Sequence, residues 1–146
     1  MKRLVLPVIF ALGAFAQTPA RKVYILPMAG GFDQYLAEQL ARDHVVQVVA
    51  DPKIADSVLT ERLGETFEQK MAKIHPRDEK KDDQKTDDLH PGFRSSAAKG
   101  TVFLVDANTR QVLWSDYEKP PHSRSGGSLN HAAAKIAKKL EAALSK

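Results

Sequence analysis

The strongest constraint on the fold is a pair of short apolar runs separated by an amphipathic segment. The first run, 22–28 (KVYILPM), is almost continuously apolar, as expected of a buried strand. The second, 45–49 (VVQVV), is rich in β-branched valine, which favours a strand. Between them, Gly30-Gly31 breaks the pattern, and apolar residues over 32–42 recur at helical spacing. We therefore expect a β-α-β unit with its helix on one face of a sheet.

The middle of the chain continues this alternation in shorter pieces. Asp51 can cap a helical turn and Pro52 suits its first position, which predicts one turn over 52–56. A strand is expected over 57–63. Residues 65–74 fit a helix, because apolar side chains recur at spacings of four and three, although helix and strand remain alternatives in this part of the chain.

The last third of the chain predicts a hairpin and a long helix. Strands are expected over 101–105 and 111–117, joined by a polar turn that contains Asp106 and Asn108. Ser128 is then expected to cap a final helix whose apolar residues form one stripe, with most of its lysines facing outward.

A charged stretch at 75–99 interrupts these patterns. It is rich in lysine and aspartate, and Leu89 and Phe93 are its large apolar residues. Such a segment cannot bury enough apolar surface to offset its ordering entropy, so we expect a mobile loop.

Together the patterns predict an α/β (α+β) fold. One domain at 22–146 would hold a single small sheet of about five strands, two main helices packed on it and this charged insertion.

The first sixteen residues have the layout of a secretory signal peptide. A positive start precedes an apolar run at 4–15, and an A-x-A sequence ends at Ala16, so cleavage is expected between Ala16 and Gln17. A retained membrane anchor is the alternative, but the apolar run is shorter than the roughly 20 residues of a spanning helix. We expect a leader at 1–16, a linker at 17–21 and a periplasmic or secreted domain.

Cysteine content and charge narrow the classes of function. The chain contains no cysteine, which excludes disulfides, zinc–thiolate sites and cysteine nucleophiles, and which fits a bacterial envelope protein. Its formal net charge is +4, and loss of Lys2 and Arg3 with the leader would lower it by two. Lysine and arginine are interleaved with acidic residues, so no basic block indicates nucleic-acid binding. We predict no nucleic-acid partner and, after cleavage, no integral membrane span.

Three stretches carry a family resemblance, namely 54–60 (IADSVLT), 104–115 (LVDANTRQVLWS) and 132–140 (AAAKIAKKL). They resemble, in turn, the entry to a strand, the hairpin and the closing helix of the amino-terminal domain of TolB-type periplasmic proteins, whose layout the curli-secretion lipoprotein family shares. The resemblance implies a small periplasmic α/β domain. Arg110 stands where that hairpin usually has glycine, no β-propeller follows, and the charged stretch is an insertion. The start at 23–33 is also similar to short secreted proteins of soil bacteria.

The Gly30-Gly31 turn suggests a small-molecule site. It lies between a strand and a helix, where backbone amides and a helix N-terminus could hold a phosphate. Neither a Lys-Ser/Thr pair after the glycines nor a G-x-G-x-x-G motif is present. Asp33 would cap the helix, and its charge argues against an anion. Gly30, Gly31 and Asp33 are the candidate ligand-binding residues of an alternative hypothesis, in which the chain is a secreted small-ligand or metal-binding protein or an enzyme, with His44 nearby in sequence.

No pattern predicts catalysis or a cofactor. The histidines form neither an HExxH motif nor a close pair, and His75 and His90 only flank the acidic stretch. No serine lies in a G-x-S-x-G motif, and His122 is next to Ser123 in sequence only. We predict no catalytic residue, no specific metal site and no cofactor.

Trp114 and Tyr117 are the candidate partner-binding residues. Since they are three apart on a strand, they point to opposite faces, and Trp114 is expected to share a face with Val112. Core packing is the simpler expectation for Trp114, and the functional alternative is an aromatic anchor on an edge strand that accepts a partner's strand. The leading hypothesis is a non-catalytic envelope domain that binds a protein partner, either at a sheet edge or through the charged stretch.

Overall fold

The computed structural model describes residues 21–76, 100–119 and 125–146. These residues form one mixed five-stranded sheet and three α-helices, the α+β class that the sequence predicts. The expected leader, its cleavage site between Ala16 and Gln17, and all but the first two residues of the charged stretch 75–99 lie outside the described residues. The elements, in chain order, are β1 (Lys22–Ile25), η1 (Ala29–Gly31), α1 (Phe32–Arg42), β2 (Gln47–Val48), η2 (Pro52–Ile54), β3 (Ser57–Thr60), α2 (Glu65–Ile74), β4 (Thr101–Asp106), β5 (Val112–Tyr117) and α3 (Gly126–Leu144).

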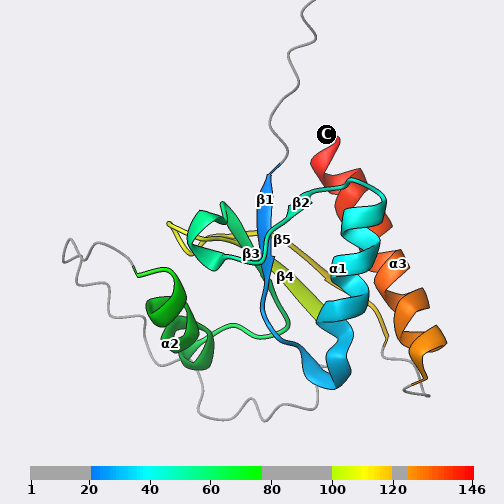
Figure 1. Ribbon diagram of the computed structural model, residues 1–146, viewed down its shortest axis with the longest axis horizontal. Coiled ribbons are helices and arrows are strands. Elements are labelled where there is room, and N and C mark those ends of the chain that lie inside the picture. The colour runs from blue at the N-terminus through cyan, green and yellow to red at the C-terminus, as the bar shows by residue number, and fades with distance from the viewer. Residues whose placement is uncertain (1–20, 77–99, 120–124) are drawn as a thin grey trace, which may run out of the picture.

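The strands lie in the order β2-β1-β3-β4-β5 (Figure 1). β1 pairs in parallel with β2 and with β3, so the β-α-β unit expected near the start of the chain is present. β3 and β4 are antiparallel, and so are β4 and β5, which form the expected hairpin. The outer strands are therefore β2, which has two residues, and β5, which has six.

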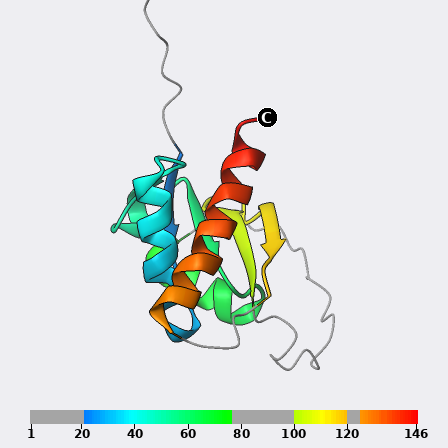
Figure 2. The ribbon, with the colours of Figure 1, turned by 90° about the vertical axis from the view of Figure 1, so that its right-hand side faces the viewer.

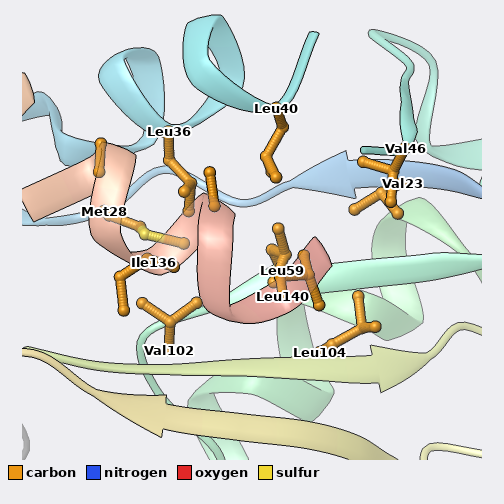
Figure 3. Close-up of a cluster of buried hydrophobic side chains, with 12 residues drawn as sticks. Val23, Met28, Leu36, Leu40, Val46, Leu59, Val102, Leu104, Ile136 and Leu140 are labelled. Atoms are coloured by element: carbon orange, nitrogen blue, oxygen red, sulfur yellow. The ribbon is translucent and has the colours of Figure 1, made fainter. Parts of the chain in front are cut away.

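Helices α1 and α3 lie side by side on one face of the sheet (Figures 1 and 2). Their apolar stripes and the strand side chains that face them form the larger core (Figure 3). A polar bridge also joins the two helices, because Nε2 of the buried Gln39 donates a hydrogen bond to Oδ1 of Asn130 at 2.5 Å. Ten side chains of this core are labelled in Figure 3, namely Val23, Met28, Leu36, Leu40, Val46, Leu59, Val102, Leu104, Ile136 and Leu140.

Helix α2 packs on the opposite face, where it forms a smaller core. Its buried residues Phe67 and Met71 contact side chains from β1, β3, β4 and their ends. Figure 1 shows α2 on the other side of the sheet from α1 and α3. The partners of Phe67 and Met71 in this core are Leu26, Val58, Val105 and Ala107, with Tyr24, Ile74 and Phe103 at its margin. No residue of β5 belongs to this smaller core.

The first three strands are shorter than the sequence patterns predict. β1 ends at Ile25 instead of residue 28, β2 contains two of the five residues expected, and β3 ends at Thr60 instead of residue 63. The short β2 has a local cause, because the amide of Val45 donates to the carbonyl of Leu40 and so closes the end of α1. Just beyond the ends of β1 and β2, Leu26 and Val49 still donate to the carbonyls of Leu59 and Val23, both at 3.0 Å.

Helix bounds agree more closely with the sequence, with one correction at a cap. α1 and α2 have the predicted ends, and Asp51 caps η2 by accepting from the amide of Lys53 at 2.9 Å. The final helix, however, is capped by Ser125 and not by Ser128. The Ser125 hydroxyl accepts from the Ser128 amide at 3.4 Å, since both glycines between them join the first helical turn.

Candidate partner-binding edge at strand β5

Strand β5 forms one outer edge of the sheet and pairs with β4 alone among the described residues. Thr101 is paired with Tyr117, Val102 with Asp116 and Phe103 with Ser115. In an antiparallel ladder, every second residue directs both its N–H and its C=O toward the neighbouring strand. The edge can therefore be assigned residue by residue.

Two backbone hydrogen bonds establish which β5 residues bond to β4. The amide of Glu118 donates to the carbonyl of Gly100 at 2.9 Å. By alternation, Asp116 and Trp114 also bond to β4, whereas Ser115 and Tyr117 direct their N–H and C=O groups away from it. The pairing of β4 with β3 is consistent with this assignment. The amide of Ala107 donates to the backbone carbonyl of Asp56, just before β3, so the odd-numbered residues of β4 bond to β3. Ser115 and Tyr117 thus offer outward backbone donors and acceptors.

A bulge near the start of β5 overturns one expectation about its faces. Leu104 pairs with Trp114 but Val105 pairs with Val112, so Leu113 is an extra residue on β5. Directly paired side chains share a face, so Val112 lies with Val105 on the α2 face, while Trp114 lies with Leu104 on the face of α1 and α3. The prediction that Trp114 and Val112 share a face is wrong for this reason.

Trp114 and Tyr117 do point to opposite faces, as the sequence predicts. Trp114 is partly buried and packs against the larger core, so it contributes to folding. Tyr117 is 53% exposed. The edge strand thus carries one aromatic anchor directed into the core and one directed to solvent.

Tyr117 belongs to an exposed apolar strip, which we define as Val112, Leu113 and Tyr117. Their exposed fractions are 46%, 42% and 53%, respectively. Alternation along the strand places Leu113, Ser115 and Tyr117 on the α2 face, and Val112 is also on that face. Since α2 packs over β1, β3 and β4, it leaves the strip uncovered within the described part of the chain. Single exposed apolar residues are common on protein surfaces, but three on one six-residue edge strand form a patch.

On the other face of β5, acidic side chains are held by lysines of α3. Lys139 Nζ lies 2.7 Å from Asp116 Oδ2 and 3.3 Å from Glu118 Oε2, and Lys135 Nζ lies 2.9 Å from Glu118 Oε1. The hydrogen bond from Lys135 holds the pKa of Glu118 below its ordinary value. The hydrogen bond to Asp116 holds the pKa of Lys139 above its ordinary value. This four-residue network fixes the position of β5 against α3 and has no net charge.

The β4–β5 turn holds the starting end of β5. The Asp106 carboxylate accepts from the amides of Asn108 and Thr109 at 2.9 and 2.8 Å, and the Thr109 hydrogen bond holds the Asp106 pKa below its ordinary value. Arg110 has φ +64°, the left-handed conformation that glycine adopts most easily. Its side chain, 7% exposed, donates to the carbonyls of Ala107 and His75 and so ties the turn to the end of α2.

The sequence-predicted ligand turn is present, but its polar groups bond to one another. Gly30 and Gly31 have φ of +70° and +73°, and Asp33 lies beside them in the first turn of α1. The Asp33 carboxylate accepts from the amide of Met28 at 3.0 Å, so it does not cap α1 as predicted, because Gly31 occupies the cap position. Glu61 accepts from the neighbouring amide of Ala29 at 3.1 Å. Binding of a ligand by Gly30, Gly31 and Asp33 stays a prediction.

The histidines of the described residues do not gather at this turn. His44 is exposed and follows the far end of α1, whose 11 residues span about 16 Å. His131 is exposed on α3, and His75 follows α2. Within residues 21–76, 100–119 and 125–146, no three histidine or carboxylate side chains cluster in a way that could hold a metal ion. His90 and His122 lie outside the described residues.

No protein-family model matches the chain, and neither a curated protein nor a solved structure matches it significantly. In the described part of the chain, no helix combines the length and the apolar character needed to cross a membrane.

Of the residues at the β5 edge, the sequence predicted Trp114 and Tyr117 as partner-binding residues. It did not predict that Val112 and Leu113 are exposed, because their apolar side chains are typical of a strand core. These two residues are exposed because β5 is an outer strand, and the sequence does not show the strand order.

Proposed function

We propose that the chain is an exported, non-catalytic domain of the bacterial envelope that binds an extended segment of a partner protein along β5. The partner segment would add a sixth strand to the five-stranded sheet. Main-chain hydrogen bonds to Ser115 and Tyr117 would supply affinity, and apolar side chains packing on the strip would supply selectivity. The family resemblance and the signal-like start of the sequence support the location.

The observation that carries the proposal is the outer edge of β5, which is open among the described residues. A long edge strand with exposed apolar residues favours pairing with another chain, and proteins usually protect such strands with lysine, proline or a cover. In β5 the charged Asp116 is already paired with Lys139. The bulge at Leu113 distorts the start of the strand, but Trp114–Tyr117 continues with regular pairing to β4. Within residues 21–76, 100–119 and 125–146, nothing pairs with the outer side of this regular part of the edge.

The proposal is tested by affinity capture from an envelope extract of the producing bacterium. The purified exported chain is immobilised, and captured proteins are quantified by mass spectrometry. Ser115→Pro removes an outward amide donor at a position where an edge strand tolerates proline. Tyr117→Asp replaces the largest side chain of the strip with a charge. Both variants should lose the same captured protein by at least about tenfold, equal to about 1.4 kcal/mol.

Ile54→Asp is the matched control, because Ile54 is 51% exposed and Tyr117 is 53% exposed. Ile54 lies in η2 and is not part of β5. Circular dichroism of each variant confirms folding before capture. The proposal fails if nothing is captured above background, or if the Ile54 and Tyr117 variants lose the captured protein equally.

A further inference from the structure

We infer that β5 also pairs with β5 of a second copy of this chain, antiparallel and around a two-fold axis at Ser115. The inference rests on the proposed function insofar as both need an open β5 edge, and it names a second occupant for that edge. The product would be a symmetric dimer with one continuous ten-stranded sheet, twice the five strands of a single copy.

The backbone of β5 is suited to this pairing. Ser115 directs its N–H and C=O away from β4, so two Ser115 residues on the axis can exchange a reciprocal pair of hydrogen bonds. Tyr117 also directs its backbone groups outward, and in this register it lies opposite Leu113 of the second copy. An isologous interface requires a surface that is complementary to itself, and this edge meets that requirement at the level of the backbone.

The side chains select the same register. With the axis at Ser115, Leu113 of each copy faces Tyr117 of the other on the α2 face, so both exposed apolar pairs become cross-strand contacts. An axis at Asp116 would set two carboxylates opposite each other, which destabilises a strand pair. An axis at Trp114 would place Tyr117 opposite Gln111, which lies before the strand begins. Of these three axes, the one at Ser115 therefore sets both exposed apolar pairs opposite each other without opposing like charges.

Charge also permits a second copy at this edge. The lysines of α3 nearest β5, Lys135 and Lys139, are paired with Glu118 and Asp116. Two copies would thus meet with neutral networks and not with repelling lysines. The paired surface, one six-residue strand with its flanking side chains, is smaller than the about 1,200–2,000 Å² of a standard interface. A weak, concentration-dependent dimer is expected.

The test uses single cysteines, because the chain has none of its own. In the register proposed, the two Ser115 Cα atoms lie about 5.5 Å apart, within disulfide range. Ser115→Cys under mild oxidation should give a covalent dimer at least about tenfold faster than collision, because pairing raises the effective thiol concentration. Gln47→Cys is the matched control, since Gln47 is exposed on β2 at the opposite edge of the sheet.

A mixing experiment then tests the register. Leu113→Cys and Tyr117→Cys should each cross-link slowly alone and rapidly when mixed, because these two positions face each other across the axis. Sedimentation velocity on the unmodified chain should show a monomer–dimer equilibrium that Tyr117→Asp shifts to monomer. The inference is overturned if Ser115→Cys cross-links no faster than Gln47→Cys, or if mixing gives no acceleration.

The outcomes separate this inference from the proposed function. Slow Ser115→Cys cross-linking together with intact capture of an envelope protein would refute the dimer and leave the partner-binding edge. Rapid cross-linking without captured protein would refute the envelope partner and keep the dimer. If the chain both dimerises and binds an envelope protein, an excess of soluble chain should displace the captured protein from β5 of the immobilised chain.

Discussion

Replacing Arg110 tests how the β4–β5 turn is held, because this residue combines an unfavourable backbone conformation with a buried charged side chain. Its φ of +64° costs a non-glycine residue about 1 kcal/mol. Against this, the guanidinium donates to the carbonyl of His75 at 2.7 Å and to the carbonyl of Ala107. Hydrogen bonds from a charged donor contribute about 1.5–3 kcal/mol each. The side chain should therefore stabilise more than its backbone destabilises.

Two substitutions separate the two effects. Arg110→Ala loses both hydrogen bonds and keeps the strained backbone, so the free energy of unfolding should fall by about 3 kcal/mol, from the low end of the range for two such bonds. Arg110→Gly loses the same bonds but relieves about 1 kcal/mol of strain, so the loss should be about 2 kcal/mol. Glu68→Gln is the control, because the Glu68 carboxylate, 3.4 Å from Arg110 Nε, is 53% exposed and its ion pair should contribute less than about 1 kcal/mol.

The assay is urea unfolding followed by the fluorescence of Trp114, the one tryptophan of the chain, which packs against the larger core. Linear extrapolation gives the free energy of unfolding for each variant. The reasoning is refuted if Arg110→Gly is as stable as the natural chain or more stable. Such a result would mean that Arg110 merely occupies a glycine position and that its contacts to the end of α2 contribute nothing.

Three further predictions use the same assay. Asn130→Ala should lower the free energy of unfolding by about 1–3 kcal/mol, because it leaves the amide of the buried Gln39 without its partner; an unchanged value would show that the bridge between α1 and α3 is dispensable. Asp51→Ala should lower the free energy of unfolding by about 1 kcal/mol through loss of the η2 cap, and an unchanged value would show that this cap does not stabilise the fold. Because the pKa of Glu118 is lowered in the folded state, this carboxylate stabilises the fold at pH values above its unfolded-state pKa of about 4.3. The stabilisation is lost as the pH falls through the folded-state pKa. Because the pKa of Lys139 is raised in the folded state, this ammonium group stabilises the fold at pH values below its unfolded-state pKa of about 10.4, and the stabilisation is lost as the pH rises through the folded-state pKa. Glu118→Gln should therefore reduce the fall in the free energy of unfolding at acid pH, and Lys139→Met should reduce the fall at alkaline pH.

The elements that the sequence predicted well are those whose stability is local. The bounds of α1 and α2 agree because apolar residues at helical spacing follow a glycine that precedes each helix, although for α2 the pattern alone left a strand as the alternative. The hairpin agrees for a similar reason, since Asp106 bonds to amides two and three residues further on. Ser125 and Ser128 are both acceptable caps in sequence. The choice between them depends on whether Gly126 and Gly127 join the helix.

The features that carry the proposed site depend on tertiary pairing and were beyond sequence reasoning. No local sequence pattern marks the bulge at Leu113. The extra residue, and the sheet face on which Val112 lies, follow only from the pairing of β5 with β4. The outer position of β5 follows from the strand order, which no local pattern encodes. The predicted end of β1 was wrong likewise, because apolar residues beyond Ile25 continue the pattern without a full set of strand partners.

Site-specific photo-cross-linking in living cells tests the β5 edge most directly. A photoreactive side chain is placed at Leu113 and, in a second variant, at Ile54, which is similarly exposed but lies in η2 and not in β5. We expect discrete adducts from Leu113, of the chain with itself or with an envelope protein, and none from Ile54. Equal labelling at the two positions, or no adduct from Leu113, would show that the outer strand binds nothing.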